Sequence, residues 1–182
     1  TFLFLISLCP NLYAINADVE HIPTHQYLEI TLNQIQNAKE SIEVTMYVFS
    51  VFSDTKDSET QRLLQALVEA KKRGVEVKVV LDHNINFNDE GVPNPLPDFK
   101  NTSAYALLRQ NGIPVFFDDP AVYTHAKVIV IDKETVIIGS HNWTRAALTR
   151  NNEASVLIHS KEYAAKLLDE LHQIKLQEPS DI

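Results

Sequence analysis

Apolar and polar positions follow two different periods along this chain of 182 residues. Some stretches place apolar residues every three or four positions, as on one face of an amphipathic helix, and runs of β-branched residues lie between them. The helical spacing predicts helices at residues 25–39, 59–73, 103–110 and 161–176. The β-branched runs predict strands at residues 41–49, 75–81, 113–117, 124–131, 135–138 and 153–158.

The order of these elements predicts an α/β fold. Helices alternate with strands up to residue 117, which favours crossover connections between parallel strands. The later strands are consecutive in the chain, which allows antiparallel neighbours. We therefore expect one mixed β-sheet flanked by helices on both faces, with a long loop at residues 82–100 that contains three prolines.

The amino-terminal segment differs from the rest of the chain. Residues 1–17 carry no charge, and residues 1–8 form an apolar run that is too short to span a bilayer as a helix. Such a run is typical of a secretory signal peptide, with small-residue cleavage positions after Ala14 or Ala17. We expect a truncated signal peptide at 1–17, one catalytic domain at 18–182, and export to the periplasm or the medium. A buried strand or helix is the alternative for the apolar run.

Composition narrows the classes of function. The chain has 24 acidic and 16 basic residues, and this net charge of -8 argues against a protein that coats nucleic acid with a globally positive surface. The single cysteine excludes an internal disulfide and a thiolate zinc cluster. The four glycines form no Gly-rich phosphate loop.

Polar side chains that suit a phosphate lie around the fourth and fifth predicted strands. His125 and Lys127 are two residues apart on a predicted strand, so their side chains leave the same face. Ser140 and Asn142 are also two residues apart, directly after Gly139 at the end of the next strand. If the two strands are neighbours, the four polar side chains converge at one end of the sheet.

Each of these side chains can contribute to phosphate chemistry. Lys127 offers a point charge, and Ser140 and Asn142 can donate hydrogen bonds to non-bridging oxygens. His125 can act as a nucleophile or carry a proton. Glu153 can hydrogen-bond the second nitrogen of His125 and fix its tautomer. Taken singly, His125 is more often a surface or core residue, and Lys127 a solvated charge.

The spacing of the whole set resembles the HKD signature of the phospholipase D superfamily. The sequence has His-x-Lys, four residues, Asp132, six residues and then Gly-Ser-x-Asn, followed by Trp143-Thr144 and later Asn152-Glu153. The segments AKESIEVTMYVF and LLQALVEAKKRGVEVKVVLD are similar to the first two strands and the intervening helix of that family. The resemblance covers residues 24–175.

The resemblance implies a phospholipase D-like sandwich and a phosphodiesterase that needs no metal ion and no other cofactor. It implies that His125 attacks phosphorus and forms a phosphohistidine, and that Lys127, Ser140 and Asn142 hold the phosphoryl oxygens. By the same resemblance, Glu153 orients His125. Asp132 and Gly139, which also belong to the motif, have structural or supporting roles.

The number of motifs implies a partner. Family members use two motifs around one pocket, either in one chain or in a homodimer, and this sequence contains one. The resemblance therefore implies a homodimer that shares one active site, in which His125 of the second copy protonates the leaving alcohol and then activates water. A second motif beyond residue 182, in a longer protein, would make the pair intramolecular.

The substrate class stays open at this stage. The chain resembles small exported bacterial endonucleases and also single-motif phospholipid or cardiolipin hydrolases, so the substrate is a phospholipid or a nucleic acid. Arg145 and Arg150 are candidates for substrate binding near the site, or they cap a helix or pair with surface acids. The alternative functions are a catalytically silent phosphate-binding dimer and a phosphatidyl transferase.

Other polar residues receive a structural interpretation. His141 occupies the variable position of the Gly-Ser-x-Asn segment, and we expect it to pack away from Ser140 and Asn142. A metal site built from His83, Asp118 and their neighbours matches no known ligand spacing, so we predict no metal ligands.

Overall fold

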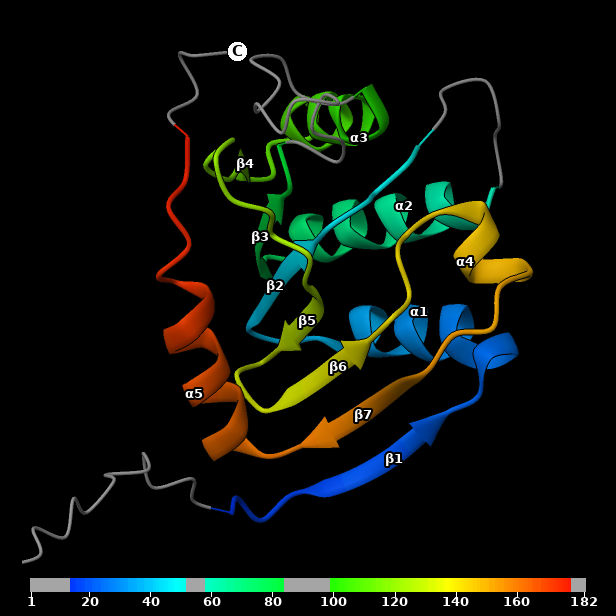
Figure 1. The fold of residues 1–182 in the computed structure, drawn as a ribbon, viewed down its shortest axis with the longest axis vertical. Helices are drawn as coiled ribbons and strands as arrows, with labels where there is room; N and C mark the ends of the chain where they lie inside the picture. Colours follow the sequence, from blue (N-terminus) through cyan, green and yellow to red (C-terminus); the bar gives the residue numbers. More distant parts are fainter. Residues whose placement is uncertain (1–13, 52–57, 84–98, 178–182) are drawn as a thin grey trace, which may run out of the picture.

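The computed structural model describes residues 14–51, 58–83 and 99–177, which form one seven-stranded sheet with helices on both faces (Figure 1). The strands are β1 (Asp18–Ile22), β2 (Ser41–Met46), β3 (Glu76–Leu81), β4 (Val115–Phe117), β5 (Lys127–Ile131), β6 (Thr135–Gly139) and β7 (Ser155–His159). The helices are α1 (Tyr27–Asn37), α2 (Glu59–Lys72), α3 (Phe99–Gln110), α4 (Arg145–Thr149) and α5 (Lys161–Leu171), with a short 3-10 helix at Thr24–Gln26. The expected α/β class is confirmed.

The order of strands in the sheet is β1-β7-β6-β5-β2-β3-β4. The pairs β2–β3 and β3–β4 are parallel, and the other neighbouring pairs are antiparallel. The crossover helices α2 and α3 connect the parallel strands, as the alternating pattern predicted. The strands therefore share one end of the sheet, which we call the site end. Strands β2, β3, β4 and β6 finish there, and β5 and β7 begin there.

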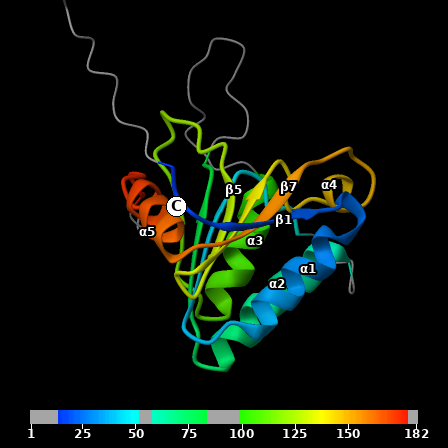
Figure 2. The ribbon, with the colours of Figure 1, turned by 90° about the horizontal axis from the view of Figure 1, so that it is seen from below.

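Helices α1, α2 and α3 cover one face of the sheet, and α5 covers the other (Figure 2). On the first face, Ile35, Leu67 and Leu108 are fully buried against the sheet. On the second face, Val128 and Val130 of β5 belong to a separate buried cluster with α5. Because β5 is buried on both faces, its sequence is a continuous apolar run without alternation.

Every predicted helix and strand is present, but two elements escaped prediction. Strand β1 is exposed at all positions except Ile22, so it lacks the apolar alternation of a half-buried strand. Helix α4 has five residues and is too short for a helical period to be recognised.

Several predicted ends differ from the structure: the strand expected at 41–49 ends at Met46, and the helix expected at 103–110 begins at Phe99. Two further differences bear on the site. The strand expected at 124–131 begins only at Lys127, because the preceding residues form a loop. The helix expected to reach residue 176 ends at Leu171. The chain after it pairs with the free edge of β4, where Asp119 N donates to Lys175 O at 3.0 Å and Gln177 N donates to Phe117 O at 2.8 Å.

Two sequence-based expectations lie largely outside the described residues. They are most of the signal peptide expected at 1–17 and most of the long loop expected at 82–100. Among the helices of the described ranges, none is long and apolar enough to cross a membrane.

Candidate active site

His125 and Lys127 lie together at the site end, as the motif predicted. His125 belongs to the loop before β5 and has an exposed side chain, whereas Lys127 opens β5 and is only 8% exposed. The Lys127 Nζ donates a hydrogen bond to the carbonyl oxygen of His125 at 2.6 Å. Both side chains also contact the ring of Tyr47, so they share one side of the loop although the loop is not a strand.

Hydrogen bonds from two neighbouring strand ends hold this loop. Tyr47 N donates to Ala126 O at 2.9 Å, directly after β2. Thr124 N donates to the buried carboxylate of Asp82 at 2.6 Å, directly after β3. His125 is therefore flanked on both sides by anchored backbone, which fixes the point from which its imidazole extends.

A second buried carboxylate supports the same region. Asp118, at the end of β4, accepts the backbone N–H of His83 at 2.7 Å. Burial raises the pKa of Asp118, although hydrogen bonds from Thr124 and His83 oppose that shift. Neutral or charged, this carboxyl ties the ends of β3 and β4 together behind the His125 loop.

Ser140 and Glu153 face each other at the two ends of the connection between β6 and β7, which contains α4. The Ser140 hydroxyl donates a short hydrogen bond to Glu153 and accepts the Ala154 N–H at 2.9 Å. The other carboxylate oxygen of Glu153 accepts a hydrogen bond from Asn151 Nδ2 at 2.9 Å. The expected hydrogen bond between Glu153 and His125 is not formed among the described residues, because the carboxylate is occupied by its own loop.

Gly139 permits this arrangement. A Cβ at Gly139 would overlap the Ser155 side chain and the carbonyl oxygen of Ala154, so β6 and β7 approach more closely here than any other residue allows. The close approach also sets the Ser140 N–H at 2.9 Å from the Ala154 carbonyl oxygen. The structural role expected for Gly139 is therefore a steric one.

Asn142 follows in a segment that a buried tryptophan holds in place. Trp143 is fully buried, its backbone N–H donates to Val48 O at 2.9 Å, and its ring meets Phe49 edge-on. Within the described residues, the buried Oδ1 of Asn142 has no hydrogen-bond partner. The amide is thus positioned by its buried neighbour.

His141 packs away from the polar site, as expected. Its ring is 1% exposed and stacks on Tyr27, with centroids 3.9 Å apart and planes 8° apart. Its Nδ1 lies 2.7 Å from Ser155 Oγ. Burial lowers the pKa of His141, although the charge of Glu153 and a backbone contact at Thr24 oppose that shift. This histidine stabilises the loop as a neutral side chain.

Asp132 lies at the opposite end of the sheet. Its carboxylate accepts the backbone N–H groups of Lys39, Glu40 and Ser41 at 2.8–3.1 Å, where the chain enters β2. Partial burial alone would raise the pKa of Asp132, but these three donors lower it below its ordinary value. Asp132, the aspartate of the motif, therefore connects β5 to β2. It contacts none of the four candidate phosphate-binding side chains, which are His125, Lys127, Ser140 and Asn142.

Arg145 and Arg150 lie at the two ends of α4, with exposed side chains. Arg145 is the first residue of the helix and Arg150 follows its last turn. No ion pair with an acid holds either side chain in the part of the chain that the structure describes, so the surface-pairing alternative is wrong there. Substrate binding by these arginines stays a prediction.

The electrostatics favour a neutral imidazole beside a cation. Burial lowers the pKa of His125, and the neighbouring Lys127 charge lowers it further. Burial also lowers the pKa of Lys127, while the negative charges of Glu153 and Asp82 oppose that shift. An unprotonated histidine is a competent nucleophile, and a buried ammonium is a strong partner for an anionic oxygen.

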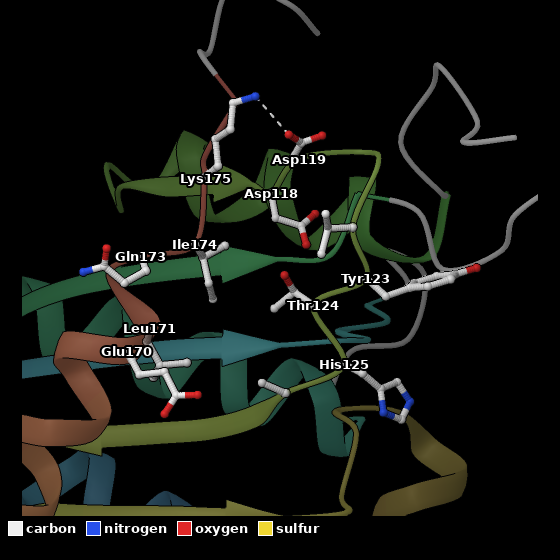
Figure 3. Close-up of a pocket in the computed structure, with 12 residues that line it drawn as sticks. Asp118, Asp119, Tyr123, Thr124, His125, Glu170, Leu171, Gln173, Ile174 and Lys175 are labelled. Atoms are coloured by element: carbon white, nitrogen blue, oxygen red, sulfur yellow. Dashed lines mark hydrogen bonds and ion pairs between the residues drawn. The ribbon is translucent and has the colours of Figure 1, made fainter. Parts of the chain in front are cut away.

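A pocket of about 560 Å³ lies behind the His125 loop, between residues 118–126 and 170–175. Figure 3 shows the Thr124, Leu171 and Ile174 side chains directed toward this pocket, whereas the His125 imidazole extends away from it. Val122 and Tyr123, on the same loop, are 63% and 40% exposed. The loop thus separates an apolar hollow from the polar site.

Several of these supporting residues could not be recognised from the sequence. Tyr47, Asp82 and Thr124 act through contacts between segments that are distant in the chain, and no local pattern marks them. In the described ranges, no three His, Cys, Asp or Glu residues gather as a metal ion would require.

Comparisons with known proteins identify the family of this chain. Residues 31–175 match the family model described as "Cardiolipin synthase, PLD-like domain". A phospholipase D of Rickettsia typhi is 33% identical over 159 residues, which are 87% of this chain and 68% of the relative. The mitochondrial cardiolipin hydrolase of Canis lupus familiaris is 29% identical over 143 residues, and the match spans 79% of this chain but only 48% of that protein.

A solved structure extends the likeness to three dimensions. The phospholipase D family member Nuc from Salmonella typhimurium superposes with a TM-score of 0.69 at 30% identity, and the match covers 90% of this chain and 98% of Nuc. NucT from Helicobacter pylori, at 20% identity and a TM-score of 0.64, shares the fold. The family model, the bacterial relative and the shared fold together establish that this chain belongs to the phospholipase D superfamily.

Proposed function

We propose that this chain is a phosphodiesterase of the phospholipase D type, which hydrolyses phosphodiester bonds of a phospholipid or a nucleic acid. The observation that carries the proposal is the exposed His125 imidazole beside the buried Lys127 ammonium, 2.6 Å from the His125 carbonyl oxygen. Membership of the superfamily supports the same reaction class.

The first step is attack by His125. A nitrogen of the neutral imidazole forms a bond to phosphorus, the bond from phosphorus to the leaving oxygen breaks, and that oxygen takes a proton. Lys127 and Asn142 hold the phosphoryl oxygens, and their charge and dipole stabilise the crowded transition state. Ser140 helps through its hydrogen bond with Glu153, which holds the loop that carries Asn142.

The reaction needs a second proton carrier, which we assign to a second copy of the chain. His141, the nearest histidine in sequence, is buried against Tyr27 and cannot reach a substrate at the site end. The protonated His125 of the partner copy gives its proton to the leaving oxygen, and then takes a proton from the water that cleaves the phosphohistidine. Hydrolysis returns one neutral and one protonated imidazole, the state in which the cycle began.

We also propose that no metal ion takes part. Metal ions in other phosphodiesterases neutralise the developing negative charge. Here two Lys127 side chains, one from each copy, supply that charge. Catalysis should therefore persist in EDTA.

Two features of the site end bear on the substrate. The exposed side chains of Val122 and Tyr123 suit an apolar lipid surface. The exposed Arg145 and Arg150 suit a polyanion such as nucleic acid. The geometry fits both substrate classes, so the experiment compares them directly.

The test measures turnover of single-stranded DNA, RNA, phosphatidylcholine and cardiolipin vesicles side by side in EDTA, together with the mass of the protein in solution. His125→Asn should abolish turnover of whichever substrate is cleaved. His159→Asn, at the opposite end of the sheet, is the matched control and should keep full activity. Turnover by the His125→Asn variant would overturn the mechanism, and complete loss in EDTA would overturn the metal-free claim.

A further inference from the structure

The side chain of Tyr47 contacts both principal catalytic groups. Its ring centroid lies 4.4 Å from that of His125, with the planes 62° apart, and the Lys127 Nζ lies 4.6 Å from the same centroid. Tyr47 is half-buried and follows the last residue of β2. One aromatic ring thus joins the two side chains that the motif places two residues apart.

The backbone of Tyr47 is fixed on both sides. Its N–H donates to Ala126 O at 2.9 Å, between the two catalytic positions. Its carbonyl oxygen accepts a hydrogen bond from the fully buried Asn101 Nδ2 at 2.9 Å. Asn101 also binds Phe49 N at 2.8 Å and Asp82 O at 2.8 Å. The backbone that carries the ring is therefore held by the ends of β2 and β3 and by α3 before any substrate binds.

The two contacts have different chemical effects. An ammonium close to an aromatic ring is attracted by the ring quadrupole, and the attraction grows when the pair is shielded from water. This contact favours the charged form of Lys127 at a place where burial disfavours it. The edge-on contact with His125 restricts rotation of the imidazole and keeps water from one of its sides.

We propose that Tyr47 is a positioning residue, whose aromatic ring holds the His125 imidazole and the Lys127 ammonium in their mutual orientation for attack on phosphorus. It acts through these two side chains and does not touch the reacting atoms. The aromatic ring makes both contacts, so phenylalanine at this position should preserve the function of tyrosine. The kinetic test of this inference rests on the proposed function, whereas its titration test needs only the folded protein.

The kinetic test compares Tyr47→Phe, Tyr47→Leu and a matched control, Tyr163→Leu. Tyr163 packs on the opposite face of the sheet, on α5, so its loss removes similar apolar surface away from the site. Tyr47→Leu should lower kcat by about tenfold with little change in KM, because binding groups stay and orientation is lost. Tyr47→Phe and Tyr163→Leu should keep kcat within about twofold of the parent protein.

The titration test follows the His125 ring by NMR in the same variants. Lys127 is the charged group that faces His125, and Glu153 and Asp82 are the charges that act on Lys127. Without the Tyr47 ring, water reaches the imidazole and the Lys127 ammonium moves. The pKa of His125 should therefore rise toward its ordinary value of about 6.5. The acidic limb of the kcat/KM profile should shift to higher pH in step.

The outcomes separate the two proposals. If the parent protein cleaves no phosphodiester, the proposed function fails, while an upward shift of the His125 titration in Tyr47→Leu and none in Tyr47→Phe still supports the positioning role. If the His125 titration is the same in all variants, or if Tyr47→Phe is as impaired as Tyr47→Leu, the positioning role of the ring is wrong. Thermal unfolding of each variant checks the fold, and if Tyr47→Leu does not fold, Tyr47→Met serves in both tests.

Discussion

The hydroxyl of Ser140 donates a hydrogen bond to the carboxylate of Glu153 and so joins the two ends of the connection between β6 and β7. The same hydroxyl accepts the N–H of Ala154 at 2.9 Å, and Asn151 binds the second carboxylate oxygen at 2.9 Å. The pair therefore organises the loop that precedes β7. This arrangement differs from the expected contact between Glu153 and His125, and it changes what substitutions at these positions should do.

Ser140→Ala and Glu153→Gln should be strongly coupled. Ser140→Ala removes this hydrogen bond, and Glu153→Gln leaves one acceptor oxygen for the two donors Ser140 and Asn151. Both changes loosen the segment that carries Asn142, so each should lower kcat by roughly tenfold, and the double variant should be little worse than the less active single variant. A double-mutant cycle on kcat measures the coupling. Independent, multiplied losses would instead indicate that Glu153 acts on a different group, such as His125 of a second copy.

Gly139→Ala should disturb both stability and catalysis. The added Cβ overlaps Ser155 and the Ala154 carbonyl, so β6 and β7 must separate, at a cost of about 1–3 kcal/mol in the free energy of unfolding. Because Ser140 follows directly, kcat should fall at temperatures where the variant is still folded. Urea unfolding and initial rates measure the two effects.

Gly112→Ala is the control for that substitution. Gly112 has a φ of +72° with open space around its Cα, so alanine there costs conformational energy without displacing a neighbour. It should lower stability but leave kcat unchanged. Equal kcat values for the two alanine variants would contradict the steric role of Gly139.

Asp132→Asn should lower stability without lowering kcat. The carboxylate accepts three backbone N–H groups, and an amide in its place presents a donor to at least one of them, which costs about 1–2 kcal/mol. The folded pKa of Asp132 is depressed, so its contribution is complete above about pH 4 and is lost as pH falls through the folded pKa.

Urea unfolding at pH 7 and near pH 3 tests this assignment. The difference in stability between the parent protein and Asp132→Asn should shrink on acidification. A fall in kcat at pH 7 in a folded Asp132→Asn variant would place Asp132 in the reaction, contrary to its position at the far end of the sheet.

His141 should make the protein less stable in mild acid. Burial depresses its folded pKa, so below about pH 6.5 the unfolded chain binds a proton that the folded chain resists. Its contribution is present above that pH and is lost as pH falls through the folded pKa. His125 acts in the same direction, so the comparison must isolate His141.

His141→Phe keeps an aromatic ring against Tyr27 and cannot be protonated. Stability measured between pH 7 and pH 5 should fall less steeply in His141→Phe than in the parent protein. The variant should also lose some stability at pH 7, because Ser155 Oγ loses its partner at 2.7 Å. Identical pH slopes would show that His141 is not the responsible group.

The sequence predicted most elements of the fold because their apolar periods are local properties. Helix α2 and strand β3 lie almost where their patterns placed them. Strand β1 was missed because its exposed residues have no apolar face, although it completes the sheet by pairing with β7. The end of α5 was misplaced because pairing of residues 175–177 with β4 depends on a neighbour distant in sequence.

The sequence by itself predicted the candidate chemistry of this protein: an imidazole, an ammonium, a hydroxyl and an amide at fixed spacing around two consecutive strands. That prediction came from the residue types, their spacing and the resemblance to the HKD signature. Tertiary structure alone decided how these groups are supported. The antiparallel pairing of β5 with β6 joins the two halves of the motif. The parallel strands β2 and β3 bring Tyr47 against His125 and Lys127, and Asp82 against Thr124. Such contacts depend on strand order, and strand order is set by the burial of the whole sheet.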